Sequence, residues 1–382
     1  MRFIHDGVLF SEGAIRERAR RYGFSDPLPV ELFLWCCEVA AQLQSELDGL
    51  VLKGGAAVQL HLPVEMQRGS VDVDFVGALR QDDIAEAMWK VHERLEKLEF
   101  KPHKPKHPKM GIPLVTYFVS APALVPSRTG GKRELKVEFL LEDFGLPVET
   151  VTKVETFAAV IEKIKCYSVT SLIGDKLLTL AENTIGVREP ADVPKQIYDV
   201  ALLSEQHKMA GEQLAEVVGV IERLTQAEAG YRNLKLTPED ALVDVAKTME
   251  KYSVLDTAGA DREIKRNITN FQQFYIGESQ RRPWYEWCVW ALRIRFLTHL
   301  ILSTFEGQST INDAASDYAL AIKLSRELKG FSGEKAKELK RNLLELACRE
   351  TPFLKELKGK PVHRVFWHVV NRENLSVIQS MV

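Results

Sequence analysis

The chain has little of what marks secreted, zinc-binding or membrane proteins. Its five cysteines lack CxxC spacing and a neighbouring histidine cluster. This argues against a disulfide framework or a structural zinc site and favours reduced thiols. We find no apolar run of about 18 residues. The amino terminus also lacks the apolar core of a signal peptide. The sequence therefore predicts a cytoplasmic protein without a membrane-spanning helix.

An excess of charge of either sign is also missing. The formal net charge is −2 across 382 residues, so the overall composition gives no sign of nucleic-acid binding. Any basic surface must be local. Two stretches qualify, from Lys101 to Lys109 and from about Lys329 to Arg372. Such runs fit ordinary solvated charge or a grip on a nucleic-acid backbone.

Strand-like alternation is confined to the first half of the chain. It predicts strands at 71–76, 114–120 and 134–141. Helical spacing predicts helices at 29–50, 82–98, 171–183 and 193–203, and beyond Glu205 at 213–226, 238–252, 262–275, 283–303, 311–328 and 334–348. The expected fold class is α+β, with a small mixed sheet flanked by helices in residues 1–204 and an all-α domain in residues 205–382.

Two aspartates, Asp72 and Asp74, stand one residue apart on an apolar strand. Side chains at i and i+2 face the same way. Two unit charges about 4 Å apart repel by about 4 kcal/mol at an effective dielectric of about 20. Mg²⁺ between them would reverse that sign, and it prefers one or two carboxylates with phosphate oxygens. An isolated pair of this kind also fits a solvated edge strand. Glu138, on the polar side of a later strand, is a candidate third carboxylate.

Two glycines precede the aspartates. Gly54 and Gly55 are expected to follow the apolar end of the first predicted helix. Glycine lets backbone N–H groups approach a phosphate closely, although any turn also uses it. Together with the carboxylates, the pair indicates a phosphate-binding site.

These residues resemble a known signature. Leu52 to Gly55 (LKGG) and Arg68 to Phe75 (RGSVDVDF) resemble "LKGG…R.S.DLDF" of the AbiEii/AbiGii toxin family, in the polymerase-beta-like nucleotidyltransferase superfamily. Ser171 to Leu180 (SLIGDKLLTL) resembles the family helix whose lysine reaches the triphosphate. Lys195 to Leu203 (KQIYDVALL) resembles "RD.YDL..LL", but Gln196 replaces the first aspartate, which puts a role for that position in doubt.

The resemblance implies a nucleotidyltransferase that uses Mg²⁺ and an NTP. In that frame Asp72 and Asp74 are catalytic metal ligands, and Glu138 holds a second cation or accepts a proton. The alternative for Glu138 is a solvated strand residue. The nucleotide-binding residues would be Lys53, Gly54, Gly55, Ser70 and Lys176.

Two further roles follow from the downstream motifs. Lys176 would neutralise charge on the leaving pyrophosphate, unless it is a surface lysine. Asp199 would orient Lys176 or the nucleophile, and a purely stabilising pair is the alternative. Ser70 is also a hypothetical regulatory position, because a phosphoryl group there would add about two negative charges beside the site.

The resemblance further implies a toxin of a toxin–antitoxin or phage-defence pair, acting on the tRNA 3′ end and opposed by a separately encoded antitoxin. Two alternatives stay open. The acceptor could be a protein or a small molecule, or the chain could be a non-catalytic module that senses a nucleotide or binds a partner. The intact Asp72, Asp74 and Lys176 argue against the second.

Overall fold

The computed structural model describes residues 2–103, 111–126, 130–347 and 354–382. They form two compact units, each described here by itself. Unit 1 comprises Met1–Ile173, Ala227–Lys235 and Thr269–Arg281, and unit 2 comprises Gly174–Gln226, Leu236–Ile268 and Arg282–Val382. Three of the five unit boundaries fall within helices, namely α5 (Val169–Thr179), α7 (Gly211–Arg232) and α9 (Arg262–Tyr275). The expected domain division at residue 204 stays a prediction.

Unit 1 is built on a seven-stranded mixed sheet with the order β3-β4-β5-β2-β1-β7-β6. β2 is antiparallel to β1 and parallel to β5, so it lies near the centre. The strands are β1 (Val51–Lys53), β2 (Asp72–Val76), β3 (Glu99–His103), β4 (Leu114–Pro122), β5 (Lys132–Leu140), β6 (Val148–Glu155) and β7 (Val160–Tyr167). The accompanying helices are α1 (Glu12–Arg21), α2 (Leu28–Glu46), α3 (Gly54–Gln59) and α4 (Gln81–Arg94).

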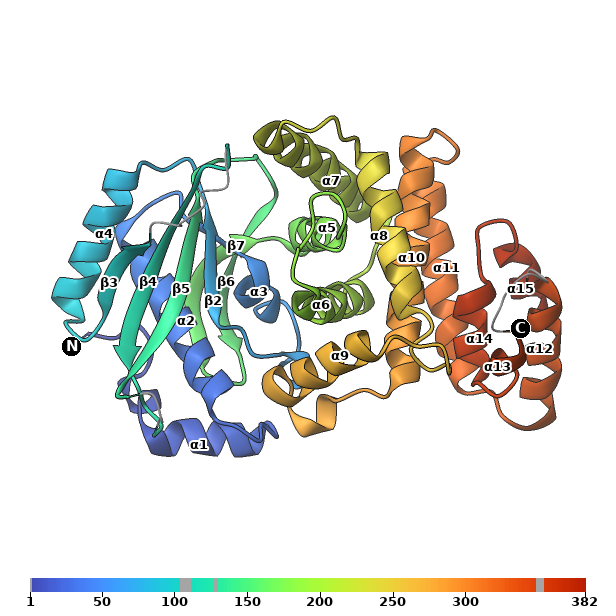
Figure 1. Cartoon of the computed structure of the whole chain (residues 1–382), viewed down its shortest axis with the longest axis horizontal. Coiled ribbons are helices and arrows are strands. Elements are labelled where there is room, and N and C mark those ends of the chain that lie inside the picture. Colours follow the sequence, from blue (N-terminus) through green and yellow to red (C-terminus); the bar gives the residue numbers. More distant parts are fainter. Residues whose placement is uncertain (1, 104–110, 127–129, 348–353) are drawn as a thin grey trace. The chain divides into compact units, whose positions relative to one another are not determined.

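Alternation along the central strands decides which face is buried. On β2, Val73 and Phe75 are buried, while Asp72 and Asp74, which alternate with them, are partly exposed. On β5, Val137 and Phe139 are buried in the same way. The rings of Phe75 and Phe139 stack with centroids 5.4 Å apart. Helix α2 packs against β2, β5, β7 and α4 (Figure 1). The polar side chains of β2 and β5 therefore share one face of the sheet.

Several elements differ from the sequence expectation. Gly54 follows the short strand β1 and not a helix end, because the first helix stops at Glu46. Strands β3, β6 and β7 were also missed. In β7 the buried residues include Ile161, Ile164 and Cys166, so the alternation is broken. The expected strands at 71–76, 114–120 and 134–141 are confirmed as β2, β4 and β5.

Unit 2 is helical throughout its described residues. Its helices are α6 (Val193–Gln206), α8 (Pro238–Tyr252), α10 (Trp284–Phe305), α11 (Ile311–Lys329), α12 (Gly333–Leu346), α13 (Leu354–Leu357), α14 (Val362–Val369) and α15 (Leu375–Met381). A short 3-10 helix at Pro190–Asp192 also lies in unit 2, whereas those at Gly7–Leu9, Val64–Met66 and Glu278–Gln280 belong to unit 1. The mixed sheet followed by helices confirms the predicted fold class.

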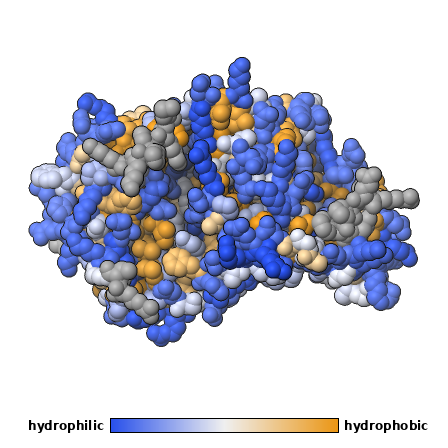
Figure 2. Space-filling view, in the orientation of Figure 1, coloured by the Kyte–Doolittle hydropathy of each residue, from blue (hydrophilic) through white to orange (hydrophobic). Residues whose placement is uncertain are grey.

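One helix corrects the expectation that no segment could span a membrane. By length and composition α10 is long and apolar enough, although 78% of its most apolar window is buried inside the protein. That burial is what the central helix of a folded bundle shows, and Trp287 and Trp290 are part of it. The face in view in Figure 2 is mostly hydrophilic, with apolar residues in separate patches.

The four described cysteines are free and buried: Cys36, Cys37, Cys166 and Cys288. Burial raises the pKa of Cys36 well above its ordinary value, and the neighbouring Cys37 and the negative charges of Asp72 and Asp74 raise it further. Reduced, unreactive thiols are therefore the expected state of these side chains. Cys348 lies outside the described residues.

A buried ion pair fixes β5 to α2. Arg133 donates to both carboxylate oxygens of Glu31, at 2.9 Å each, and Glu31 also accepts from the backbone N–H of Leu124. Glu31→Ala would leave the guanidinium buried without its counter-ion, so we expect a loss of about 3–5 kcal/mol in the free energy of unfolding.

Urea denaturation measures that loss. The matched control is Glu12→Ala on α1, which breaks a solvent-exposed pair with Arg16 and should cost no more than about 1 kcal/mol. Equal effects of the two substitutions would contradict the role assigned to Glu31.

Candidate active site

Strand pairing collects the predicted carboxylates on the polar face of the sheet. Asp74 lies opposite Lys53 on β1 and opposite Glu138 on β5, while Asp72 lies opposite Lys136 on β5. All five positions belong to unit 1. Residues aligned across adjacent strands project to the same side, so three carboxylates and two lysines share one patch. The sequence anticipated the carboxylates and Lys53 but missed Lys136.

Gly54 occupies a position that only glycine fits. Its φ is +70°, and a Cβ there would lie 2.1 Å from Oδ2 of Asp74. The backbone at the end of β1 thus lies directly against the carboxylate. This close approach is the structural reason for the first glycine of the LKGG motif.

Gly54→Ala should lower the rate of nucleotide transfer strongly while lowering stability only slightly. The added methyl group costs about 1–2 kcal/mol in the left-handed region, and it must displace the Asp74 carboxylate. Because a displacement of about 1 Å can cost about 100-fold in rate, we expect nucleotide transfer to fall by about that factor. Gly13→Ala on α1 is the matched control, since its Cβ meets nothing within 4 Å. Full transfer activity in Gly54→Ala would show that the close approach has no catalytic importance.

The second glycine packs against the buried segment that leads into β2. A Cβ on Gly55 would lie 2.9 Å from both Nη2 of Arg68 and Oγ of Ser70. The amide of Gln59 ties the segment together, because it accepts from the Arg68 backbone N–H at 2.8 Å and donates to the Gly55 carbonyl at 3.0 Å. Ser70 is only 6% exposed. Gln59 thus links Gly55 to Arg68, a role the sequence reasoning did not identify.

Both carboxylate oxygens of Glu138 already accept a hydrogen bond. Its Oε2 accepts from Nζ of Lys136 at 2.6 Å, and its Oε1 accepts from Oγ1 of Thr116 at 3.2 Å. Burial lowers the pKa of Lys136, but its hydrogen bond to Glu138 and the charges of Glu138, Asp72 and Asp74 outweigh burial and raise that pKa overall. Lys136 therefore remains protonated at neutral pH and neutralises part of the carboxylate charge.

The aspartates suit a hard divalent cation by their chemistry. Mg²⁺ takes one or two protein carboxylates and completes its shell with phosphate oxygens and water. Asp72 and Asp74 supply that number from one strand face. No group of three or more acidic, histidine or cysteine side chains is arranged to hold a metal within the described part of the chain.

Unit 2 brings together the residues of the two downstream motifs. Nζ of Lys176 donates to Oε1 of Gln196 at 2.8 Å and lies 3.5 Å from Oδ2 of Asp199. The side chain of Lys176 is 7% exposed and that of Asp199 is inaccessible. Lys176 is thus not a surface lysine. Gln196, whose role the sequence left in doubt, is a direct partner of Lys176.

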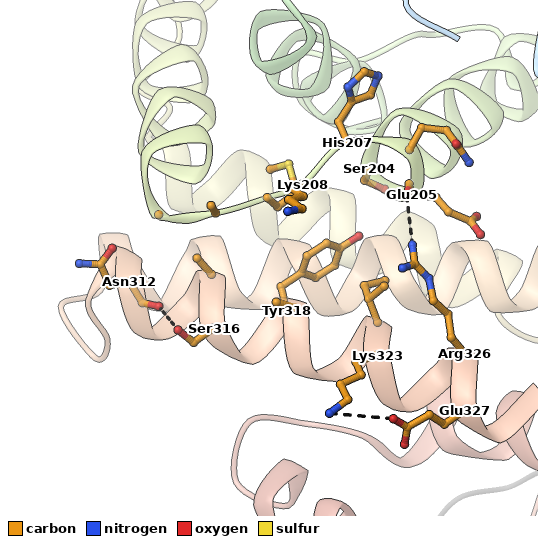
Figure 3. A pocket seen from close by; sticks show the side chains of 17 residues that line it. Ser204, Glu205, His207, Lys208, Asn312, Ser316, Tyr318, Lys323, Arg326 and Glu327 are labelled. Carbon is orange, nitrogen blue, oxygen red and sulfur yellow. Dashed lines mark hydrogen bonds and ion pairs between the residues drawn. The ribbon is translucent and has the colours of Figure 1, made fainter. Parts of the chain in front are cut away.

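Unit 2 also contains a sizeable cavity. It has a volume of about 830 Å³ and is lined within unit 2 by the end of α6, the loop that follows and one side of α11 (Figure 3). Its lining includes Lys208 and Tyr318 but none of the predicted site residues. We assign the chemistry to the carboxylate face, since volume alone does not make an active site. Of the predicted basic loop, residues 104–110 lie outside the described residues.

Known proteins were compared with the chain. The family model described as "Nucleotidyl transferase AbiEii toxin, Type IV TA system" matches residues 39–284. No curated protein matches. Among solved structures, the nucleotidyltransferase toxin MenT4 from Mycobacterium tuberculosis H37Rv is 15% identical, with 77% of this chain and 98% of that chain covered and a TM-score of 0.41.

Two further solved structures have similarly low sequence identities and TM-scores. A putative nucleotidyltransferase from H. pylori is 14% identical, covering 74% of this chain and 97% of its own, with a TM-score of 0.39. An antigenic nucleotidyltransferase-like protein from Paracoccidioides brasiliensis is 16% identical, covering 54% and 94%, with a TM-score of 0.34. The assignment therefore rests on the family model, which spans more than half of the chain and both groups of site residues. The chain belongs to the AbiEii family of nucleotidyltransferase toxins.

Proposed function

We propose that this nucleotidyltransferase uses Mg²⁺ to move a nucleoside monophosphate from an NTP to a hydroxyl at the tRNA 3′ end. The observation that carries the chemistry is the register of β1, β2 and β5, which sets Asp72, Asp74 and Glu138 on one face beside the LKGG turn. A bound divalent cation would neutralise charge on the triphosphate and lower the pKa of an attacking hydroxyl.

Each residue of the carboxylate face has its own role in this proposal. Asp72 and Asp74 would hold the cation. The backbone at Gly54 and Gly55 would approach the phosphates, with Lys53 and the Ser70 hydroxyl beside it. Glu138, which accepts from Lys136 in this structure, would be the third carboxylate. Support for these roles comes from the shared strand face and from the close contact between Gly54 and Asp74.

For Lys176 the support is different. It is a buried cation held by Gln196 and Asp199, so its ammonium group is oriented before a ligand arrives. A preorganised cation stabilises developing negative charge better than a mobile one. We propose that Lys176 meets the leaving pyrophosphate and that Asp199 acts as its positioning residue.

The biological setting follows from membership of the family. A type IV toxin has a separately encoded antitoxin, and we propose a cytoplasmic site of action because tRNA is the proposed acceptor. The rival acceptors are a protein hydroxyl and a small molecule. The basic stretch from Lys329 to Arg372 is the candidate contact with a nucleic-acid backbone, and such binding would weaken steeply with salt.

Labelling with each radioactive NTP in turn identifies the acceptor. The protein is incubated with Mg²⁺ and either intact tRNA or tRNA whose 3′-terminal diol has been oxidised with periodate. We expect label in intact tRNA and none in oxidised tRNA. Label in protein from a cell extract, with none in tRNA, would favour the rival acceptor. Undiminished toxicity of an Asp72→Ala variant in cells would favour a non-catalytic module.

A further inference from the structure

The carboxylate face carries its own cations. Lys53 lies opposite Asp74, and Lys136 lies opposite Asp72. Nζ of Lys136 is 2.6 Å from Oε2 of Glu138, two residues along the same strand. Counting only these five side chains, three negative and two positive charges leave the patch with a net charge of −1. Lys136 accounts for half of the positive charge.

We propose that Lys136 is a positioning residue that holds Glu138 and keeps free divalent cations off the carboxylate face until a triphosphate arrives. The inference rests on the proposed function and names the order in which metal and nucleotide enter. No activity of Lys136 itself is required, because its effect is exerted through Glu138 and through the local charge.

The number of ligands available to a divalent cation explains why a triphosphate would allow the cation to bind. With an NTP present, Asp72, Asp74, phosphate oxygens and water complete the shell that Mg²⁺ prefers. Without an NTP, the remaining protein carboxylate on this face is Glu138. Its Oε2 is already hydrogen-bonded to Lys136, and its Oε1 is hydrogen-bonded to Thr116. A free cation that takes Glu138 as a ligand must therefore displace the lysine ammonium group, whereas a cation that carries a triphosphate need not.

Lys136 and Glu138 can separate easily, because both side chains are partly exposed. The side chain of Lys136 is 40% exposed and that of Glu138 is 23% exposed. The long lysine side chain can therefore leave the carboxylate for water without opening the core. Val137, which lies between them, points into the core and fixes the strand.

Mn²⁺ binding without nucleotide tests the proposal directly. Calorimetric titration compares the wild type with Lys136→Met, which keeps the length of the side chain and removes its charge. Since the variant doubles the negative charge of the patch and frees Glu138, we expect Mn²⁺ to bind at least about tenfold more tightly. Lys132→Met is the matched control. It lies four residues away on β5, paired with Glu99, and should bind Mn²⁺ like the wild type.

Thermal unfolding gives a readout that needs no binding isotherm. In EDTA, Lys136→Met leaves the carboxylates to repel one another, so its Tm should lie below that of the wild type. Saturating Mn²⁺ should remove the difference. Unchanged or weaker Mn²⁺ binding in Lys136→Met would overturn the proposal, and so would a drop in Tm that Mn²⁺ does not reverse.

A further titration separates this proposal from the function on which it rests. Mn²⁺ is added to the wild type with a non-hydrolysable NTP analogue, and Asp74→Asn serves as the comparison. If the wild type binds the Mn²⁺–analogue complex and Asp74→Asn does not, the proposed metal site is supported. The Lys136→Met titration then tests the role of Lys136 independently of the proposed function. If the wild type fails to bind the complex, the proposed function and the inference both fall.

Discussion

Asp74→Asn should abolish nucleotide transfer almost completely while leaving the fold intact. The amide keeps the shape of the side chain against Gly54 but removes the charge that would hold a cation. A metal ion supplies several kcal/mol of stabilisation to a phosphoryl-type transition state. Losing about 4 kcal/mol corresponds to about a thousandfold fall in rate, and we expect at least that reduction.

The measurement is the initial rate of label transfer at saturating Mg²⁺ and NTP. Asp83→Asn, in the exposed first turn of α4, is the control for removing an aspartate charge from unit 1, and it should transfer at the wild-type rate. Circular dichroism in EDTA checks that Asp74→Asn remains folded. A rate within tenfold of wild type would remove Asp74 from the catalytic machinery.

Lys176→Met should damage both activity and stability, and the two effects can be separated. Removing a preorganised cation costs about 100- to 1,000-fold in rate. The same substitution leaves Asp199 inaccessible to water and without its cation, which costs about 3–5 kcal/mol in the free energy of unfolding.

The double variant Lys176→Met/Asp199→Asn distinguishes these effects. It removes both charges of the pair, so urea denaturation should show most of the lost stability restored. Its rate should nevertheless stay as low as that of Lys176→Met. If activity recovered together with stability, Lys176 would be a structural residue, as in the stabilising-pair alternative considered for Asp199.

Local patterns in the sequence were sufficient to predict β2 and β5. The alternation in Val71–Val76 and in Glu134–Leu141 showed which side of each strand is polar, and the structure confirms both strands. It could not show that Asp74 lies opposite Glu138, because pairing between strands far apart in the chain has no local signal. The importance of Lys136 became visible only through that register.

The missed features have physical reasons of the same kind. β1 has only three residues, too few for a period to appear, so the LKGG motif was attached to a helix end. Gln196 was doubted because it departs from the family's aspartate. An amide oxygen can still accept a hydrogen bond from a lysine, and the position keeps its contact with Lys176.

The position of the label within the NTP tests the central claim most directly. Parallel reactions contain intact tRNA, Mg²⁺ and either α-³²P- or γ-³²P-labelled nucleotide. Transfer of a nucleoside monophosphate places the α label in tRNA and releases the γ label in pyrophosphate, and Asp74→Asn should lose the α signal. Incorporation of the γ label would show phosphoryl transfer instead. Incorporation of neither label, from any of the four NTPs, would contradict nucleotide transfer to tRNA.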